Sequence, residues 1–195
     1  DFSSLLLDKE LSCIILANIK PVICFTKEDL LTEEETKQYQ EIRAYYTSIG
    51  VPCFSYKELK ELLKFLQNSI VVLTGQTGAG KTTILNRIAP ELNLKTNEIS
   101  AALNRGKHTT RHTEIHVLNG VWFCDTPGFS SLELRNYTKE EIRDSFIEFS
   151  NYSCYYRDCM HKQEPDCGVK KALEEGKILK SRYENYQKIE KEESL

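Results

Sequence analysis

The sequence predicts an α/β protein: a three-layer sandwich of strands and helices, followed by a small, mostly helical module. Three features predict this arrangement. Short apolar runs rich in β-branched residues alternate with helical segments as far as residue 125. A glycine-rich loop stands directly between one such run and a helix. Cysteines cluster with a histidine in the charged, tyrosine-rich segment that begins at residue 136.

Five short apolar segments are expected to be strands. They are residues 19–25, 51–55, 68–74, 113–118 and 121–125. The segments at 19–25 and 68–74 read as buried parallel strands. The last two flank Asn119-Gly120, a dipeptide that readily supplies positive φ angles, and so predict a hairpin. A complete sheet of this kind has one strand more, which we expect in a segment that precedes Asp1.

Helical segments connect these strands. Thr32 precedes three glutamates, an acidic first turn that suits the positive end of a helix dipole, and the polar helix that follows is expected to end near Gly50. Leucines at positions 59, 62, 63 and 66 recur at helical spacing and predict a second helix.

Composition limits the classes of function. A net charge of −3 argues against a strongly basic surface for nucleic acid, so any RNA contact is expected to be local. No apolar run is long enough to span a membrane and no secretory leader opens the chain, so we expect a cytoplasmic protein without a membrane partner. In that compartment disulfides are not expected. Because the chain begins with Asp1 rather than Met, we expect it to be part of a longer protein.

The glycine-rich loop matches the phosphate-binding P-loop, in the required place between a strand and a helix. Its residues are Gly75, Gln76, Thr77, Gly78, Ala79, Gly80, Lys81 and Thr82, and Thr83 continues the helix. The glycines let backbone N–H groups point at phosphate oxygens, while the helix N-terminus adds positive potential. Lys81 is expected to reach the β and γ phosphates, and Thr82 to offer its hydroxyl to magnesium. A chance glycine-rich turn is the alternative.

Two further motifs indicate a guanine nucleotide. Asp125-Thr126-Pro127-Gly128 ends an apolar strand, where Asp125 is expected to order the magnesium shell and the Gly128 N–H to meet the γ-phosphate. Thr26-Lys27-Glu28-Asp29 resembles the GTPase base-recognition motif, usually Asn-Lys-x-Asp. Asp29 would accept from the N1 and N2 donors of guanine, a pair that adenine lacks.

The base-recognition motif has further expected contacts. Lys27 would lay its alkyl stem against the guanine ring. Thr26 replaces the commoner Asn, so one contact to the base edge is expected to be weaker. Ser55 is a candidate for the loop that meets guanine O6 through backbone N–H. The alternative for Lys27 and Asp29 is an ordinary solvated charge pair.

The order of the motifs is inverted relative to ordinary GTPases. The base-recognition motif lies 54 positions before the P-loop, counted from Lys27 to Lys81. A circularly permuted domain explains this order, because chain termini commonly lie close together at the surface and can be rejoined without changing the core.

Three cysteines and one histidine lie within 14 residues: Cys154, Cys159, His161 and Cys167. Four such soft ligands suit tetrahedral zinc, and a closed structural site is the better interpretation because no further polar group is set for catalysis. Buried or incidental cysteines are the alternative. The remaining cysteines stand in apolar stretches and are expected to be core residues: Cys13, Cys24, Cys53 and Cys124.

Two more runs carry a family resemblance: Gly106-Lys107-His108-Thr109-Thr110-Arg111-His112 and Asp125-Thr126-Pro127-Gly128-Phe129-Ser130-Ser131-Leu132-Glu133. With the inverted order and the cysteine cluster, the chain closely resembles the RsgA (YjeQ) family of GTPases over essentially its whole length. The resemblance implies a circularly permuted P-loop GTPase domain over residues 1–135, with its first strand missing, and a helical zinc-binding domain over residues 136–195. Family members also carry an N-terminal OB-fold RNA-binding domain, which is expected to precede Asp1.

The resemblance also implies a function. It implies a GTP hydrolase that acts late in maturation of the small (30S) ribosomal subunit. With GTP bound, the protein would dock on that subunit and its rRNA. The subunit would stimulate GTP hydrolysis, and the protein would dissociate with GDP bound. The implied cofactors are GTP or GDP, Mg²⁺ and one structural Zn²⁺. We expect a monomer.

Residues 104–112 are expected to form the mobile switch I loop. Family alignment favours Thr110 over Thr109 as the second hydroxyl on magnesium. Phe129 stands where many GTPases have a Gln that orients the attacking water, so slow intrinsic turnover is expected. Family precedent makes His108 the catalytic residue once the ribosome positions it. The alternative is that His108 and its basic neighbours contact rRNA phosphates.

Two rival functions are a circularly permuted GTPase of large-subunit assembly and a GTP-gated RNA-binding scaffold with little hydrolysis. The cysteine cluster after Gly128 disfavours the first, whereas Phe129 permits the second. After Cys167, lysines alternate with acidic residues, as on a solvated helix face. Tyr183 and Tyr186 are expected to pack or to stack on the ribosome.

Overall fold

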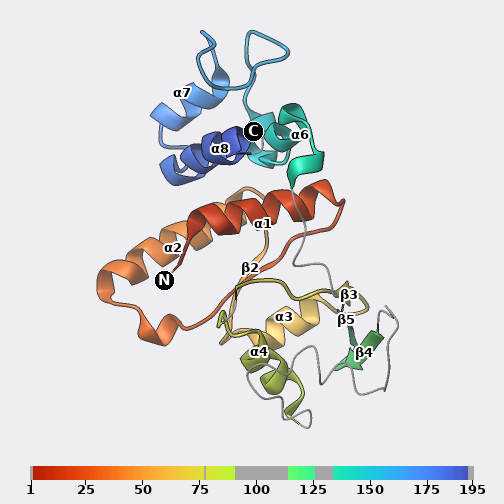
Figure 1. Ribbon diagram of the computed structural model, residues 1–195. Coiled ribbons are helices and arrows are strands. Elements are labelled where there is room, and N and C mark those ends of the chain that lie inside the picture. Colours follow the sequence, from red (N-terminus) through yellow and green to blue (C-terminus); the bar gives the residue numbers. More distant parts are fainter. Residues whose placement is uncertain (1, 77, 91–113, 126–133, 193–195) are drawn as a thin grey trace. The chain divides into compact units, whose positions relative to one another are not determined.

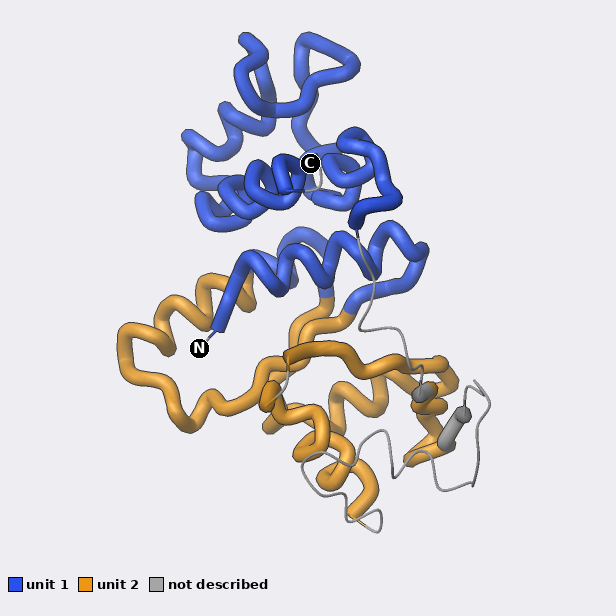
Figure 2. The backbone as a smooth tube through the Cα atoms, viewed as in Figure 1, with its two compact units in different colours: residues 1–21, 45–51, 132–195 blue, residues 22–44, 52–131 orange. Residues whose placement is uncertain are grey.

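The computed structural model describes residues 2–76, 78–90, 114–125 and 134–192 (Figure 1). The chain divides into two compact units, coloured separately in Figure 2. Unit 1 comprises residues 1–21, 45–51 and 132–195, and unit 2 comprises residues 22–44 and 52–131. Among the described residues, no helix has the length and apolar character needed to cross a membrane.

Unit 2 contains all five strands that the sequence predicts, most of them shorter than expected. They are β1 (Ile23–Phe25), β2 (Cys53–Ser55), β3 (Ile70–Val71), β4 (Glu114–Leu118) and β5 (Val121–Asp125). β1 pairs in parallel with β2. β5 pairs in parallel with β3 and antiparallel with β4, which confirms the hairpin. In the described part of the chain the strands thus form two sheets, β1-β2 and β3-β5-β4, rather than one.

The predicted burial of the strand at residues 68–74 is wrong at its start. Ile70 is 59% exposed although it pairs with β5, and Val71, the other residue of this segment that joins the ladder, is half-buried. The core of this sheet lies instead between β5 and the helix that follows the glycine-rich loop. Val121 and Phe123 are buried there against residues of α4.

The helices of unit 2 follow the sequence signals. They are η1 (Glu28–Leu30), α2 (Glu33–Ser48), whose residues 45–48 belong to unit 1, α3 (Leu59–Phe65) and α4 (Lys81–Ile88). Thr32 begins α2 as expected: its hydroxyl accepts from the Glu35 N–H at 3.3 Å, and its own N–H donates to the Glu35 carboxylate at 2.8 Å. Apolar residues of α3 and α4 pack into the core beside β5. These helices therefore position the loops that follow β2 and β3.

Unit 1 is helical. Its elements include α1 (Ser4–Leu16), η4 (Leu134–Asn136), α6 (Lys139–Asp144), η5 (Ile147–Asn151), α7 (Gly168–Glu174) and α8 (Lys180–Glu192). Helix α1, which the sequence analysis did not assign, begins where the Ser3 hydroxyl accepts from the Leu6 N–H, and it packs against α8. Phe146, Phe149 and Tyr186 form an aromatic centre with ring centroids 5.2–5.4 Å apart.

A buried ionic cluster ties the first helix of unit 1 to its last. Arg182 on α8 is 1% exposed and donates to Asp8 of α1 at 2.6 Å and to Glu148 at 2.8 Å. Asn185 and Tyr45 donate to the same two carboxylates at 2.7 and 3.0 Å. A buried charge is tolerated only when it is paired and fully hydrogen-bonded, so these contacts fix how α1 and α8 meet.

None of the seven cysteines is joined in a disulfide. Cys13 is buried in the core of unit 1, which confirms its predicted role. The prediction is wrong in degree for Cys24, Cys53 and Cys124, which are only half-buried. They lie in β1, β2 and β5, and Cys24 still packs against the core beside β5.

Candidate functional site

Residues 75–82, the phosphate loop, have the backbone that a P-loop requires at each described glycine. Gly75, Gly78 and Gly80 have φ angles of 133°, 80° and 96°, values that residues with side chains rarely adopt. Gly80 caps the N-terminus of α4, and its carbonyl accepts from the Ile84 N–H at 3.0 Å. Thr82 and Thr83 lie in the first turn of that helix. The loop therefore delivers backbone N–H groups and a helix N-terminus to one place.

Lys81 turns back onto this loop. Its ammonium donates to the carbonyl oxygen of Gly75 and, at 2.8 Å, to that of Gln76. These carbonyls hold the charge beside the place where phosphate oxygens bind in a P-loop. A short movement of Nζ would exchange carbonyl acceptors for phosphate acceptors.

Thr26 joins the base-recognition motif to the phosphate loop. Its hydroxyl donates to the Ala79 carbonyl at 2.6 Å, across 53 residues of sequence. A Cβ at Gly80 would lie 3.3 Å from Thr26 Cγ2, so a side chain there would press on this contact. The sequence analysis expected Thr26 at the edge of the base and did not foresee this bond. The two motifs therefore meet in space despite their inverted order.

Asp29 lies just after β1 with a partner that the sequence analysis missed. Lys27 has a φ of 59°, a left-handed backbone that turns the chain into η1, where Asp29 lies. The Tyr56 hydroxyl donates to Asp29 Oδ1 at 3.3 Å. The Arg87 guanidinium of α4 lies 4.7 Å from the centre of the Tyr56 ring. Tyr56 thus links the loop after β1 to that after β2.

Ser55, at the end of β2, is 3% exposed. Its N–H donates to Glu58 at 2.7 Å, and Glu58 also accepts from Arg43 at 2.6 Å. The Arg43 guanidinium, aided by the Ser55 N–H, holds the pKa of Glu58 below its usual value. The N–H groups at positions 56–58 likewise have acceptors within β1 and this loop. An N–H contact with guanine O6 would therefore require one of these bonds to open.

Of the remaining residues predicted to bind the nucleotide, the structure describes the backbone of Asp125 but not the others. Asp125 is the last residue of β5 and lies opposite Glu114 of β4. Thr77, His108, Thr110 and Gly128 lie outside the described residues, as does the whole expected switch I loop. Their assignments stay predictions.

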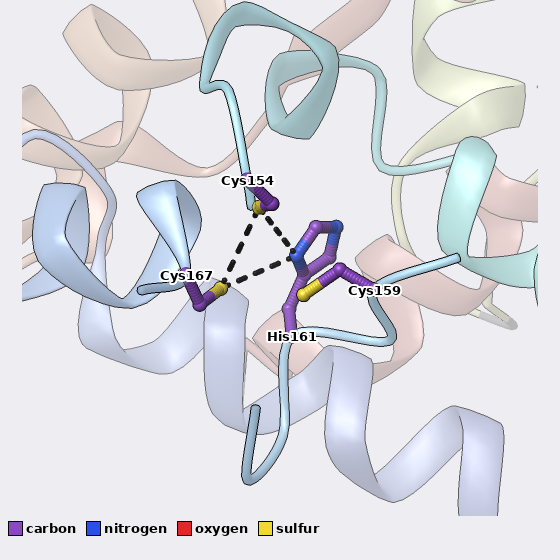
Figure 3. A group of neighbouring side chains, drawn as sticks. All are labelled: Cys154, Cys159, His161 and Cys167. Carbon is purple, nitrogen blue, oxygen red and sulfur yellow. Dashed lines mark hydrogen bonds between the residues drawn. The ribbon is translucent and has the colours of Figure 1, made fainter. Parts of the chain in front are cut away.

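The four predicted metal ligands converge (Figure 3). The ligand atoms of Cys154, Cys159, His161 and Cys167 all lie within 4.8 Å of one another. Cys154 Sγ is 3.8 Å from Cys167 Sγ, and His161 Nδ1 is 3.5 and 3.4 Å from these two sulfurs. A tetrahedral zinc with Zn–S of about 2.3 Å and Zn–N of about 2.0 Å requires edges of about 3.8 Å and about 3.5 Å. The three distances among Cys154, His161 and Cys167 match these edges, and Cys159 Sγ lies within 4.8 Å of the other ligand atoms. We name the four residues the metal cluster.

Tight turns bring these ligands together. His161 and Asp166 have φ angles of 59° and 52°. A Cβ at Gly168 would lie 2.2 Å from the Ser153 carbonyl oxygen, so only glycine lets the segment before Cys154 approach the start of α7. Cys167 caps α7, and its sulfur accepts from the Lys170 N–H at 3.5 Å. Such N–H donors are typical second contacts of a metal thiolate.

Side chains of α8 and of the loop hold the turn around His161. Glu164 accepts from the Met160 and Lys162 N–H groups, both at 2.7 Å. Tyr183 donates to the His161 carbonyl at 2.5 Å and Tyr186 to the Met160 carbonyl at 2.7 Å. Tyr183 is 8% exposed and Tyr186 is fully buried, so of the two expected roles the structure confirms packing and not stacking on the ribosome. Their rings pack in the interior, where the two hydroxyls donate to the carbonyls of the turn.

Burial also shifts the pKa values of side chains in the metal cluster. Burial raises the pKa of the Cys159 thiol to about 12 and lowers the pKa of His161. Both shifts favour the uncharged groups, so a bound cation is needed to hold the thiolate form.

Comparison with known proteins places this geometry in one family. The model of the family described as RsgA GTPase matches residues 1–135. The small ribosomal subunit biogenesis GTPase RsgA of Bacillus velezensis is 45% identical over 98% of this chain and 67% of its own length. The corresponding proteins of Latilactobacillus sakei and Bacillus subtilis are each 43% identical over 95% of this chain and 65% of theirs. The chain thus spans about two thirds of these relatives.

Solved structures agree. The crystal structure of YjeQ from Thermotoga maritima has a TM-score of 0.79 at 32% identity, covering 98% of this chain and 66% of that one. The structure of YloQ, described as a circularly permuted GTPase, has a TM-score of 0.78 at 32% identity, covering 100% and 64%. These matches establish the α/β GTPase fold, and the metal cluster occupies the C-terminal part. The inverted motifs, the converging ligands and the matched residues lead to one conclusion: the chain belongs to the RsgA GTPase family.

Proposed function

We propose that this protein hydrolyses GTP to GDP and phosphate during late maturation of the small ribosomal subunit, and that the subunit stimulates hydrolysis. Relatives of 45% and 43% identity carry the name small ribosomal subunit biogenesis GTPase. We assign residues 1–135 to the nucleotide domain and residues 136–195 to a helical zinc-binding domain.

The phosphate end of the nucleotide is bound by the phosphate loop. Backbone N–H groups of residues 75–80 and the start of α4 receive the phosphate oxygens. Lys81 leaves the carbonyls of Gly75 and Gln76 and pairs with the β and γ phosphates, so its bond partners change from neutral to anionic. Thr82 and Thr83 lie at the same helix end. A side-chain hydroxyl beside the phosphates is a natural ligand for magnesium.

The base end is bound by Asp29. Its carboxylate accepts from guanine N1–H and N2–H, and an adenine edge would leave this carboxylate without donors. Tyr56 steadies one carboxylate oxygen, and the left-handed backbone at Lys27 directs the chain around the ring. We assign the backbone N–H groups of the loop at Ser55 to guanine O6.

Hydrolysis depends on residues of the two switch segments. We assign Thr110, Asp125 and Gly128 to the γ-phosphate and its ion, and His108 to orienting the attacking water. Magnesium, when bound, neutralises the charge that develops on the phosphate oxygens. Phe129 cannot orient a water, so turnover without the ribosome is slow.

The metal cluster holds one structural Zn²⁺. All four positions of a tetrahedron are taken by protein ligands, which leaves no open position for a substrate. Bound zinc would replace the apolar core that residues 154–167 are too few to build. We propose that the protein is a cytoplasmic monomer whose partner is the small ribosomal subunit and its rRNA.

The observation that carries this function is the hydrogen bond from Thr26 to Ala79, which supports placing base and phosphate recognition on one nucleotide. The test measures GTP hydrolysis with and without purified small subunits. We expect stimulation by small subunits and none by large subunits. Stimulation by neither particle would favour a GTP-gated scaffold, and stimulation by large subunits alone would favour the large-subunit alternative.

A further inference from the structure

An arginine at the end of α4 lies against an aromatic ring rather than a carboxylate. Arg87, in the last turn of this helix, is exposed, and its guanidinium carbon is 4.7 Å from the centre of the Tyr56 ring. No salt bridge joins it to a carboxylate within the ranges that the structure describes. The helix dipole favours a cation at this end of α4 but does not direct it onto a ring. The contact with Tyr56 therefore needs its own explanation.

The ring that Arg87 contacts leads directly to the carboxylate assigned to guanine. Tyr56 is half-buried, and its hydroxyl donates to Asp29 Oδ1 at 3.3 Å. Asp29 itself is exposed, so this bond restricts the rotation of a side chain that has few neighbours. A cation over the face of a tyrosine ring attracts the ring and so fixes where the hydroxyl lies. Arg87 is the closer of two such cations, because the Lys57 ammonium is 5.8 Å from the ring centre.

Helix α4 connects this support to the phosphate loop. The helix begins directly after Gly80, and Thr83 and Arg87 are four residues apart, so they share one face of it. Both residues are exposed, whereas Leu85 and Ile88 are buried in the core beside β5. Because these buried residues anchor the helix, an arginine on its exposed face is a firm support for the Tyr56 ring.

We propose that Arg87 is a positioning residue for recognition of the guanine base. It holds the Tyr56 ring, whose hydroxyl fixes the Asp29 carboxylate before the nucleotide arrives. A carboxylate that is already oriented loses less conformational entropy when guanine binds. The proposal rests on the proposed function in taking Asp29 as the residue that recognises guanine. One helix then supports both ends of the nucleotide, the phosphates at its start and the base at its end.

The test measures GDP and ADP affinities by competition with a fluorescent GDP analogue. Arg87→Met keeps an unbranched side chain and removes the cation, so GDP affinity should fall about 2- to 5-fold while ADP affinity stays unchanged. Tyr56→Phe keeps the ring and removes the hydroxyl, and GDP affinity should fall about 2- to 10-fold. Lys64→Met, which removes an exposed cation from α3, is the matched control for the change in charge and should alter neither affinity.

Double variants test whether Arg87 acts through the other two residues. Arg87→Met should have no further effect on GDP affinity when it is added to Tyr56→Phe or to Asp29→Ala, because the chain of contacts is already broken. A role in folding alone would persist in both backgrounds. The melting temperature of every variant, measured without nucleotide, reports such a role separately.

The outcomes separate this inference from the proposed function. Unchanged GDP affinity in Arg87→Met would overturn the inference, and so would an undiminished effect in the Tyr56→Phe background. Equal losses of GDP and ADP affinity would overturn it as well, because they would mean that Arg87 acts on the phosphates through its charge. Each of these results leaves the proposed function intact if the unaltered chain prefers GDP to ADP. An unaltered chain without that preference would remove the function together with the inference.

Discussion

The metal cluster and the nucleotide loops bring their residues together over very different lengths of chain. The four metal ligands lie within 14 residues and need only tight turns to converge. The nucleotide residues follow three strands, β1, β2 and β3, and meet through contacts such as that of Thr26 with Ala79. A local cluster requires correct turns, whereas a distributed site requires the sheets and α4 to be in place first.

The two regions also differ in how their functional atoms point. The metal ligands already face a common centre, with spacings that match a tetrahedral ion. Lys81 instead binds carbonyls of its own loop, and Tyr56 donates to Asp29. The comparison teaches that the metal cluster is built to stay as it is, while the nucleotide loops exchange internal hydrogen bonds for contacts with a ligand.

Removing the metal should have the largest effect. Zinc contributes on the order of 10 kcal/mol or more to folding in small structural sites, so chelation should unfold the segment around residues 154–167. Cys167→Ser should lose the metal and lower the melting temperature, whereas Cys53→Ser, which alters a half-buried cysteine outside the cluster, should keep it. Metal analysis with thermal denaturation checks this. Full metal content in Cys167→Ser would show that the cluster does not hold the ion.

Lys81→Ala should have the largest effect within the nucleotide loops. It removes the charge assigned to the transferred phosphate, and the loss of one such contact lowers kcat by about 100- to 1,000-fold. Lys60→Ala, which alters an exposed lysine on α3, is the matched control and should leave kcat unchanged. Metal content should be normal in both variants. A Lys81→Ala protein that hydrolyses GTP at the unaltered rate would contradict the assignment.

Gly168→Ala tests the turns of the metal cluster. The new Cβ would lie 2.2 Å from the Ser153 carbonyl oxygen, a backbone clash that should cost about 1 to 3 kcal/mol or more and weaken metal binding. Gly176→Ala is the control, because Gly176 has a φ of 71° but no atom near its Cβ position. It should lower stability through backbone strain alone and leave metal affinity unchanged. Equal metal affinity in the two variants would show that this close approach is not required.

Thr26→Val should have the smallest effect. It keeps the shape of the side chain and removes the hydroxyl that donates to Ala79, a bond that contributes about 0.5 to 1.5 kcal/mol. GDP affinity should fall about 2- to 10-fold, while Thr26→Ser, which keeps the hydroxyl, should stay close to the unaltered chain. Calorimetry measures both. A Thr26→Val protein with unchanged GDP affinity would mean that the two motifs do not depend on this contact.

Sequence patterns predicted the parts of this molecule that depend on neighbouring residues. The strands at residues 23–25 and 53–55, the hairpin at Asn119-Gly120 and the start of α2 at Thr32 all follow from local apolar periodicity or from turn and cap residues. The metal cluster was predictable for the same reason, because its spacing is short. Helix α1 carried a signal in the Ser3 cap that the sequence analysis did not use.

Contacts between distant residues could not be predicted in this way. No local pattern indicates that Asp8 pairs with Arg182, that Tyr56 reaches Asp29, or that the Thr26 hydroxyl is used on the phosphate loop. The tyrosines show the same limit. Tyr183 and Tyr186 of α8 are buried in the core of unit 1, whereas Tyr155 and Tyr156, on the loop between Cys154 and Cys159, are exposed.

The central claim is that Asp29 and the loop around Lys81 bind the two ends of one guanine nucleotide. The most direct test is a calorimetric comparison of GDP, xanthosine diphosphate and ADP on the unaltered chain and on Asp29→Asn. Xanthine presents an oxygen where guanine presents its N2 amino group, so an amide at position 29 matches xanthine and a carboxylate matches guanine. We predict that Asp29→Asn loses GDP affinity and gains xanthosine diphosphate affinity, with weak ADP binding throughout. Unchanged GDP affinity in Asp29→Asn, or ADP bound as tightly as GDP by the unaltered chain, would contradict the claim.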